Sequence, residues 1–140
     1  MRYWLLLLGS LWGLTGTAQA ELPAVSFYLN TAYLCGGIGS DQSAAFKAAR
    51  TEFPLSLLFG QQLGERTAYI ADVQVVIRDE HDQTLVNINS DGPYCLFDID
   101  PGHYTIHSTY EGHTLSHQVQ VQGLGNQASF IWPETLNPKD

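Results

Sequence analysis

The chain has 140 residues, with six Lys and Arg residues against fourteen Asp and Glu residues and a formal net charge of −8. Nucleic acids and anionic membrane surfaces are bound through clustered Lys and Arg side chains, so this balance argues against both as partners. We interpret the acidic excess as a contribution to solubility.

Residues 1–20 have the three-part layout of a secretory signal peptide. Arg2 is followed by an apolar stretch from Leu5 to Leu14, and the Ala-Gln-Ala triplet at 18–20 predicts cleavage before Glu21. The alternative is a membrane anchor, but the apolar stretch is interrupted by Gly and Ser and is shorter than the ~20 residues that cross a bilayer. We therefore expect a periplasmic or secreted protein with no membrane span after cleavage.

The predicted mature chain keeps five basic and all fourteen acidic residues, a formal charge of −9, and is long enough for one domain. Ala32–Cys35 is predicted as a strand that ends in a Gly-Gly-Ile-Gly turn. Ser40 is a suitable N-cap for an Ala-rich helix over Asp41–Glu52. Pro54 stops this helix, and a strand beginning at Leu55 ends at Gly60. The sequence predicts an N-terminal β-α-β unit over residues 21–66.

Apolar residues alternate with polar ones in most of residues 67–132, which is the period of half-buried strands. Turns rich in Asp, Gly and Pro separate the predicted strands. The strands are expected at 69–78, 85–88, 94–99, 103–110, 113–121 and 128–132. Short strands between turns predict an antiparallel β-sandwich. The fold class is therefore mainly β, α+β overall, and residues 133–140 are expected to form a loose tail.

Two stretches in this segment carry a family resemblance. Residues 90–96 (SDGPYCL) and 99–106 (IDPGHYTI) resemble the carboxypeptidase regulatory-like domain, whose corner motif usually reads Leu-Pro-Pro-Gly where this chain has Ile-Asp-Pro-Gly. The resemblance covers about Ala68 to Trp132 and extends to uncharacterised secreted proteobacterial proteins. It implies a transthyretin-like (Ig-like) β-sandwich with an accessory or interaction role, and it brings no catalytic residues.

The mature chain has two cysteines, Cys35 and Cys95. An even count in an oxidising compartment predicts one disulfide, with two unpaired cysteines as the alternative. A thiol nucleophile would need a partner histidine and access to solvent. By alternation from Tyr94 and Leu96, Cys95 points away from the sandwich core. The predicted disulfide then holds the β-α-β unit against the outer face of the sheet.

Five histidines raise the question of a metal site. His103 and His107 share one face of a predicted strand, and His113 and His117 share one face of the next. If Tyr104 faces the core, the first pair points to solvent and the second to the core side. The candidate metal ligands are therefore His103 and His107 alone, and the zinc-peptidase pattern His-x-x-Glu is absent.

Two further motifs have ordinary structural interpretations. The acidic turn Asp79-Glu80-His81-Asp82 has carboxylates suited to calcium, but it lacks the Gly and the final Glu of a calcium loop. The turn at 36–39 before a helix resembles a phosphate-binding loop, but no Lys follows directly. We interpret the first as a solvated hairpin turn and the second as a tight strand-to-helix turn.

The favoured functional prediction is a non-enzymatic periplasmic or secreted interaction module without a cofactor. Its partner is expected to be a protein or a component of the cell envelope, bound through surface or exposed strand edges. The alternatives are a metal-binding protein that uses surface histidines and a hydrolase with an unrecognised site.

Overall fold

The computed structural model describes residues 21–135. The predicted signal peptide and the last five residues of the predicted tail lie outside this range. No helix within it is long and apolar enough to cross a membrane.

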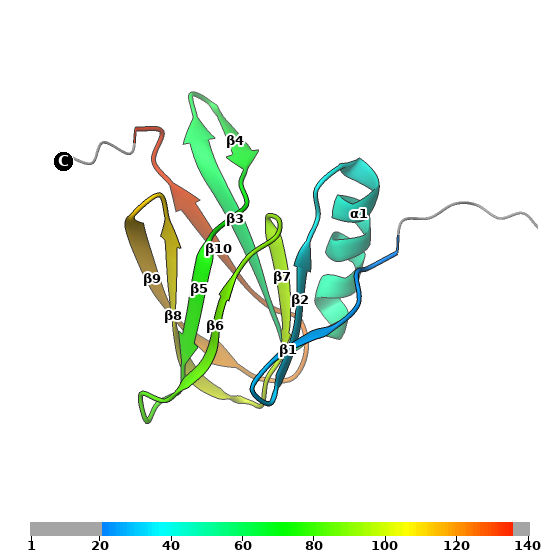
Figure 1. The fold of residues 1–140 in the computed structure, drawn as a ribbon, viewed down its shortest axis with the longest axis vertical. Coiled ribbons are helices and arrows are strands. Elements are labelled where there is room, and N and C mark those ends of the chain that lie inside the picture. Colours follow the sequence, from blue (N-terminus) through cyan, green and yellow to red (C-terminus); the bar gives the residue numbers. More distant parts are fainter. Residues whose placement is uncertain (1–20, 136–140) are drawn as a thin grey trace, which may run out of the picture.

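The protein is a sandwich of two sheets with one short helix on an outer face, as predicted (Figure 1). Sheet A has the strand order β1-β2-β7-β3-β10, with β4 paired to the second half of β3. Sheet B has the order β6-β5-β8-β9. All strand pairs are antiparallel except β3 with β10. The elements are β1 (Ser26–Tyr28), β2 (Thr31–Gly36), α1 (Ser40–Ala49), the 3-10 turn η1 (Arg50–Glu52), β3 (Leu55–Leu63), β4 (Arg66–Tyr69), β5 (Gln74–Arg78), β6 (Thr84–Asn89), β7 (Tyr94–Asp98), β8 (Gly102–Tyr110), β9 (His113–Val121) and β10 (Asn126–Trp132).

The β8–β9 hairpin forms where the sequence predicts it. Glu111 and Gly112 both have positive φ, at 49° and 82°, and Tyr110 pairs with His113 across the turn. Two consecutive residues with positive φ are what a two-residue hairpin loop requires, because they match the twist of the flanking strands. The hairpin fixes the register, and therefore the face, of every side chain on these two strands.

Helix α1 begins one residue earlier than predicted and ends earlier too. Gly39 occupies the N-cap position without a side-chain cap, so the prediction of Ser40 as N-cap is wrong. Ala49 is the last α-helical residue, and the chain tightens into η1 before Pro54. The helix packs on the outer face of sheet A through a small apolar cluster: Leu34, Phe46, Ala49, Tyr94 and Leu96.

The strand predicted over 69–78 is two strands in different sheets. Tyr69 ends β4 in sheet A, and Gln74 begins β5 in sheet B. The link between them includes Asp72 in the left-handed region (φ 60°), whose N–H donates to the carbonyl of Ser90 at 2.9 Å. Aspartate accepts this conformation more readily than most residues, so a break is possible here without glycine.

Strand β3 continues past Gly60 to Leu63, so the predicted end at Gly60 is wrong. A Cβ at Gly60 would lie 2.6 Å from Cγ2 of Thr67 on β4. The glycine therefore permits close pairing of two strands inside the sheet and does not end one.

Sheet A combines strands from both predicted segments. β7 lies between β2 and β3, so the β-α-β connection spans a strand that comes later in the chain. The boundary predicted after residue 66 falls inside β4. The start of the predicted loose tail is also held: the Gln61 side chain donates to the carbonyls of Pro133 and Glu134 at 3.2 and 3.1 Å.

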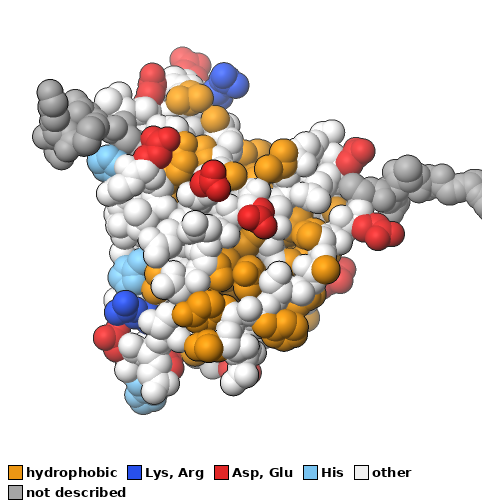
Figure 2. Space-filling view, in the orientation of Figure 1, with side chains coloured by type: hydrophobic (Ala, Val, Ile, Leu, Met, Phe, Trp, Pro, Cys, Tyr) orange, Lys and Arg blue, Asp and Glu red, His pale blue; other side chains and the backbone are white. Residues whose placement is uncertain are grey.

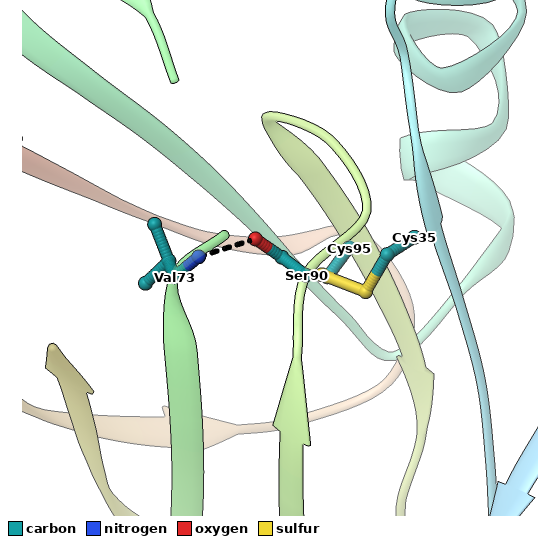
Figure 3. Close-up of a disulfide and its surroundings, with 4 residues drawn as sticks. All are labelled: Cys35, Val73, Ser90 and Cys95. Atoms are coloured by element: carbon teal, nitrogen blue, oxygen red, sulfur yellow. Dashed lines mark hydrogen bonds between the residues drawn. A yellow bond between two sulfur atoms is a disulfide. The ribbon is translucent and has the colours of Figure 1, made fainter. Parts of the chain in front are cut away.

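The disulfide Cys35–Cys95 is present, with an S–S distance of 2.05 Å (Figure 3). The two residues are directly paired on neighbouring strands β2 and β7. Cys95 is fully buried in the core between the sheets, so the predicted outward orientation is wrong. Tyr94 and Leu96 instead face α1 on the opposite side of β7. The disulfide therefore joins two strands of one sheet and does not hold a separate unit against it.

Two buried serines differ in whether their hydroxyl groups are hydrogen-bonded. Oγ of Ser90 accepts a hydrogen bond from the N–H of Val73 at 3.0 Å (Figure 3), whereas Oγ of Ser108 has no partner among the described residues. We expect Ser108→Ala to raise the free energy of unfolding by about 1 kcal/mol, because an unpaired buried hydroxyl is removed. The matched Ser90→Ala variant should lose about 1–2 kcal/mol, because the Val73 amide is left unpaired. Urea unfolding measures both, and a destabilised Ser108→Ala variant contradicts this account.

Candidate functional site

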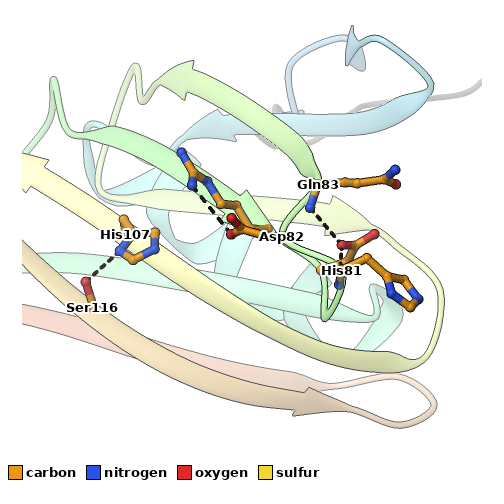
Figure 4. Close-up of polar contacts among 7 residues, drawn as sticks. His81, Asp82, Gln83, His107 and Ser116 are labelled. Atoms are coloured by element: carbon orange, nitrogen blue, oxygen red, sulfur yellow. Dashed lines mark hydrogen bonds and ion pairs between the residues drawn. The ribbon is translucent and has the colours of Figure 1, made fainter.

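His103 and His107 lie on the solvent face of sheet B. They pair across the β8–β9 ladder with Gln120 and Ser116, and Nδ1 of His107 lies 2.7 Å from Oγ of Ser116 (Figure 4). Thr109 and Thr114 form the next contact along the same face, with their hydroxyls 2.7 Å apart. This face is a polar, nearly uncharged surface.

The other histidine pair lies on the opposite face, as the alternation predicts. The ring of His117 stacks on Phe130 of β10 with 4.2 Å between centroids. The carbonyl of His113 accepts a hydrogen bond from Nε1 of Trp132 at 2.9 Å. These contacts join the edge strands β9 and β10 of the two sheets, so we assign the His117 ring a packing role.

The orientation of the two histidine pairs is relevant to the alternative prediction that the protein binds a metal ion. Because the pairs face opposite sides, His103 and His107 have no histidine partners from β9. Within residues 21–135, no three His, Cys, Asp or Glu side chains are grouped closely enough to hold a metal ion.

The Ser116–His107 contact has the first element of a hydrolytic triad, a hydroxyl beside an imidazole. In the described part of the chain, however, His107 has no carboxylate among its hydrogen-bond or ion-pair partners. The pair also lies on an open strand face, whereas hydrolysis needs amide donors that converge on an oxyanion. The geometry is that of a cross-strand polar contact.

In the acidic turn between β5 and β6, the carboxylates of Asp79 and Asp82 bind groups of the turn itself and of the adjoining Arg78 (Figure 4). Oδ1 of Asp79 accepts the N–H groups of His81 and Gln83, each at 2.9 Å. Asp82 has a positive φ of 62° and forms an ion pair with Arg78 at 3.5 Å. These contacts are typical of a hairpin turn, in agreement with the structural interpretation of this motif.

A polar pocket of about 390 Å³ lies beside this turn, between Asp79 and Glu80 on one side and His103 and Gln118 on the other. At its base the Tyr104 hydroxyl donates to the Asp100 carbonyl at 2.6 Å. Burial, and then the charges of Asp100, Asp79 and Glu80, raise the pKa of Tyr104. The hydroxyl therefore stays protonated at neutral pH and acts as a structural donor.

The glycine-rich turn before α1 is packed tightly against its neighbours. Gly37 has a φ of 97°, and a Cβ there would lie 2.6 Å from the Tyr94 ring. Its N–H donates to Oε1 of Gln42 at 2.7 Å, so this amide is not free to bind phosphate. A Cβ at Gly92 would lie only 2.4 Å from the Gly36 carbonyl oxygen. Close packing accounts for these glycines, which supports the predicted tight turn.

This packing leaves a cleft of about 580 Å³ at the top of α1, which we call the Ile38 cleft. It is formed by the β2–α1 turn, the β4–β5 link and the residue before β7. Ile38 is 66% exposed and Tyr69 is 52% exposed, although both are large and apolar. The lining residues are Gly37, Ile38, Gly39, Ser40, Ser43, Tyr69, Ile70, Ala71 and Pro93.

Tyr94 supports the cleft from below. The residue is 1% exposed, and its ring stacks on Phe46 and meets Tyr69 edge-on, each with 6.0 Å between ring centroids. Burial raises the pKa of Tyr94, against a hydrogen bond to Ser43 that lowers it. The phenol is therefore neutral at physiological pH. The cleft lies over a cluster of three aromatic rings, those of Phe46, Tyr69 and Tyr94.

Sequence reasoning did not identify this cleft. The sequence places Tyr69 on a half-buried strand and Ile38 in a tight turn, and neither position indicates a shared cleft. One signal was available, since an isoleucine between two glycines of a tight turn has little chain around it to bury it.

No protein-family model matches the chain, and a search of curated proteins finds no match.

Proposed function

We propose that this protein is a non-enzymatic interaction module that is exported to the periplasm or secreted. The observation that carries the proposal is the Ile38 cleft, an apolar opening bordered by two exposed hydrophobic side chains. Large apolar side chains left exposed at a cleft are a common feature of binding surfaces. The buried Tyr94 ring packs beneath the cleft against Phe46 and Tyr69.

Export is supported by the predicted signal peptide and by the Cys35–Cys95 disulfide, which is typical of oxidising compartments. The transthyretin-like character of the sandwich, with its resemblance to carboxypeptidase regulatory-like domains, belongs to the same proposal. It rests on the motifs at 90–96 and 99–106 and is compatible with two packed, mainly antiparallel sheets.

An affinity experiment with envelope extract tests the proposal. The immobilised wild-type protein is compared with an Ile38→Ser/Tyr69→Ser variant, and with a Thr109→Ala/Thr114→Ala variant that alters the polar face of sheet B. We expect a protein or envelope component to be retained by the wild type and the sheet B variant and lost by the cleft variant. Equal retention by all three, or none by any, would contradict an interaction role for the cleft.

The metal-binding alternative makes its own prediction. If the protein binds no metal through the sheet B histidines, a His103→Ala/His107→Ala variant will have the same metal content as the wild type after purification without chelators. Elemental analysis measures this directly. Stoichiometric zinc, copper or nickel in the wild type, lost in the variant, would favour the alternative over the proposed function.

A further inference from the structure

The charge distribution around the Ile38 cleft indicates what kind of partner it takes. Three exposed carboxylates stand next to lining residues: Asp41 follows Ser40, Asp72 follows Ala71, and Asp91 precedes Pro93 by two positions. None of the three forms an ion pair with a described residue. Figure 2 shows acidic side chains over and beside the apolar band of one face, with the basic side chains at its top and left edges.

The nearest cations along the chain lie at the far ends of their elements. Lys47 is in the last turn of α1, whose first turn borders the cleft, and Arg66 begins the strand that Tyr69 ends. The lining itself contains no Lys or Arg. The cleft therefore combines an apolar floor with three carboxylates beside its lining that form no ion pair within the described chain, while the positive charge of Arg50 reaches Tyr94 beneath it.

We propose that the Ile38 cleft binds a peptide segment that places an apolar side chain between Ile38 and Tyr69 and a Lys or Arg beside Asp41, Asp72 and Asp91. This inference rests on the proposed function and specifies its partner. The exposed face of Tyr69 adds to the selectivity, because an aromatic ring attracts a nearby ammonium or guanidinium group. A purely acidic segment would be repelled, and a second copy of this chain, with its own acidic excess, fits less well.

The position of Asp72 supports this geometry. Its backbone is in the left-handed conformation, and its N–H donates a hydrogen bond to the Ser90 carbonyl. The carboxylate is therefore attached to a hydrogen-bonded link. Asparagine tolerates the same conformation, so charge can be removed there without altering the backbone. This makes the rim testable by isosteric substitution.

The test uses three capped peptides of equal length, with cores Lys-Leu-Lys, Lys-Gly-Lys and Glu-Leu-Glu, titrated into the isotopically labelled mature protein by NMR. We expect Lys-Leu-Lys to shift the amides of residues 37–43 and 69–71. An Asp41→Asn/Asp72→Asn/Asp91→Asn variant should bind it about tenfold more weakly, since three nearby surface attractions are lost. The control, Glu52→Gln/Glu65→Gln/Asp98→Asn, removes the same charge elsewhere and should change affinity less than twofold.

Several outcomes overturn the inference: no binding, equal binding of the three peptides, shifts confined to another surface, or equal losses in the two variants. Self-association that moves the same resonances as the protein is concentrated would identify a second copy as the occupant and would also overturn it. The extract experiment separates this failure from failure of the proposed function. If a partner is retained through the cleft but the Lys-Leu-Lys peptide does not bind, the proposed function stands. Only the inference that the partner is a basic, apolar peptide segment is then overturned.

Discussion

A Cys35→Ala/Cys95→Ala variant is expected to have a free energy of unfolding about 4 kcal/mol lower than the wild type. The disulfide links residues 60 positions apart, so its loss releases a long loop in the unfolded chain. In the folded state it joins β2 to β7 at the centre of sheet A, where the segment before residue 66 meets the segment after it. Both sulfurs are buried, so the alanines also leave a small unfilled volume.

Guanidinium unfolding followed by far-UV circular dichroism measures this loss. The wild type under a strong reductant supplies an independent comparison and should approach the stability of the double variant. The double variant itself should not respond to the reductant, which controls for effects of the reagent. A variant as stable as the oxidised wild type would show that strand pairing alone holds β2 against β7.

The second large effect is expected at Trp132. This side chain is fully buried in the last described strand and packs against Phe59, Phe130 and Tyr110. Its indole N–H also donates to the His113 carbonyl, which ties β10 of sheet A to β9 of sheet B. Trp132→Ala should cost about 3–5 kcal/mol, because it removes a large core side chain and leaves a cavity at the junction of the two sheets.

Trp132→Phe is the matched control for this prediction. It keeps most of the apolar volume and loses only the hydrogen bond and part of the ring, so a loss of about 1–2 kcal/mol is expected. Circular dichroism is the appropriate probe, because Trp132 is the only tryptophan after the predicted cleavage site and fluorescence would lose its reporter. A Trp132→Ala variant no less stable than Trp132→Phe would contradict the packing described for this strand.

Local signals in the sequence predicted the elements that depend on local chemistry. The Glu111-Gly112 turn, the acidic turn and the end of the helical segment before Pro54 all follow from which residues tolerate which backbone angles. The cysteine pairing also followed, from the even count and the predicted compartment.

The orientation of Cys95 and the change of sheet after Tyr69 depend on how the elements pack in three dimensions, which local signals do not determine. Four of the five residues of β7 are buried, because α1 covers one face and sheet B the other. Alternation separates two faces, but it cannot say which of two buried faces meets the second sheet, and Cys95 was assigned to the wrong one. The change of sheet between Tyr69 and Gln74 could not be predicted for a similar reason, since the alternation continues through Asp72 although the chain passes from sheet A to sheet B there.

In the candidate site, too, some features could be predicted from the sequence and others could not. The faces of the histidines were predictable, because the β8–β9 register follows from a two-residue turn. The Ile38 cleft was not, because it is built from three separate chain segments, at 37–43, 69–71 and 93, that only the fold brings together.

Photo-crosslinking in living cells tests most directly whether this cleft is where the protein meets its partner. A photoreactive amino acid is placed at position 38 in one strain and at position 107, on the polar face of sheet B, in another. We expect a discrete adduct from position 38 that weakens when Asp41, Asp72 and Asp91 are replaced by asparagine, and no such adduct from position 107. An adduct from position 107 alone would contradict this expectation and would move the binding surface to sheet B.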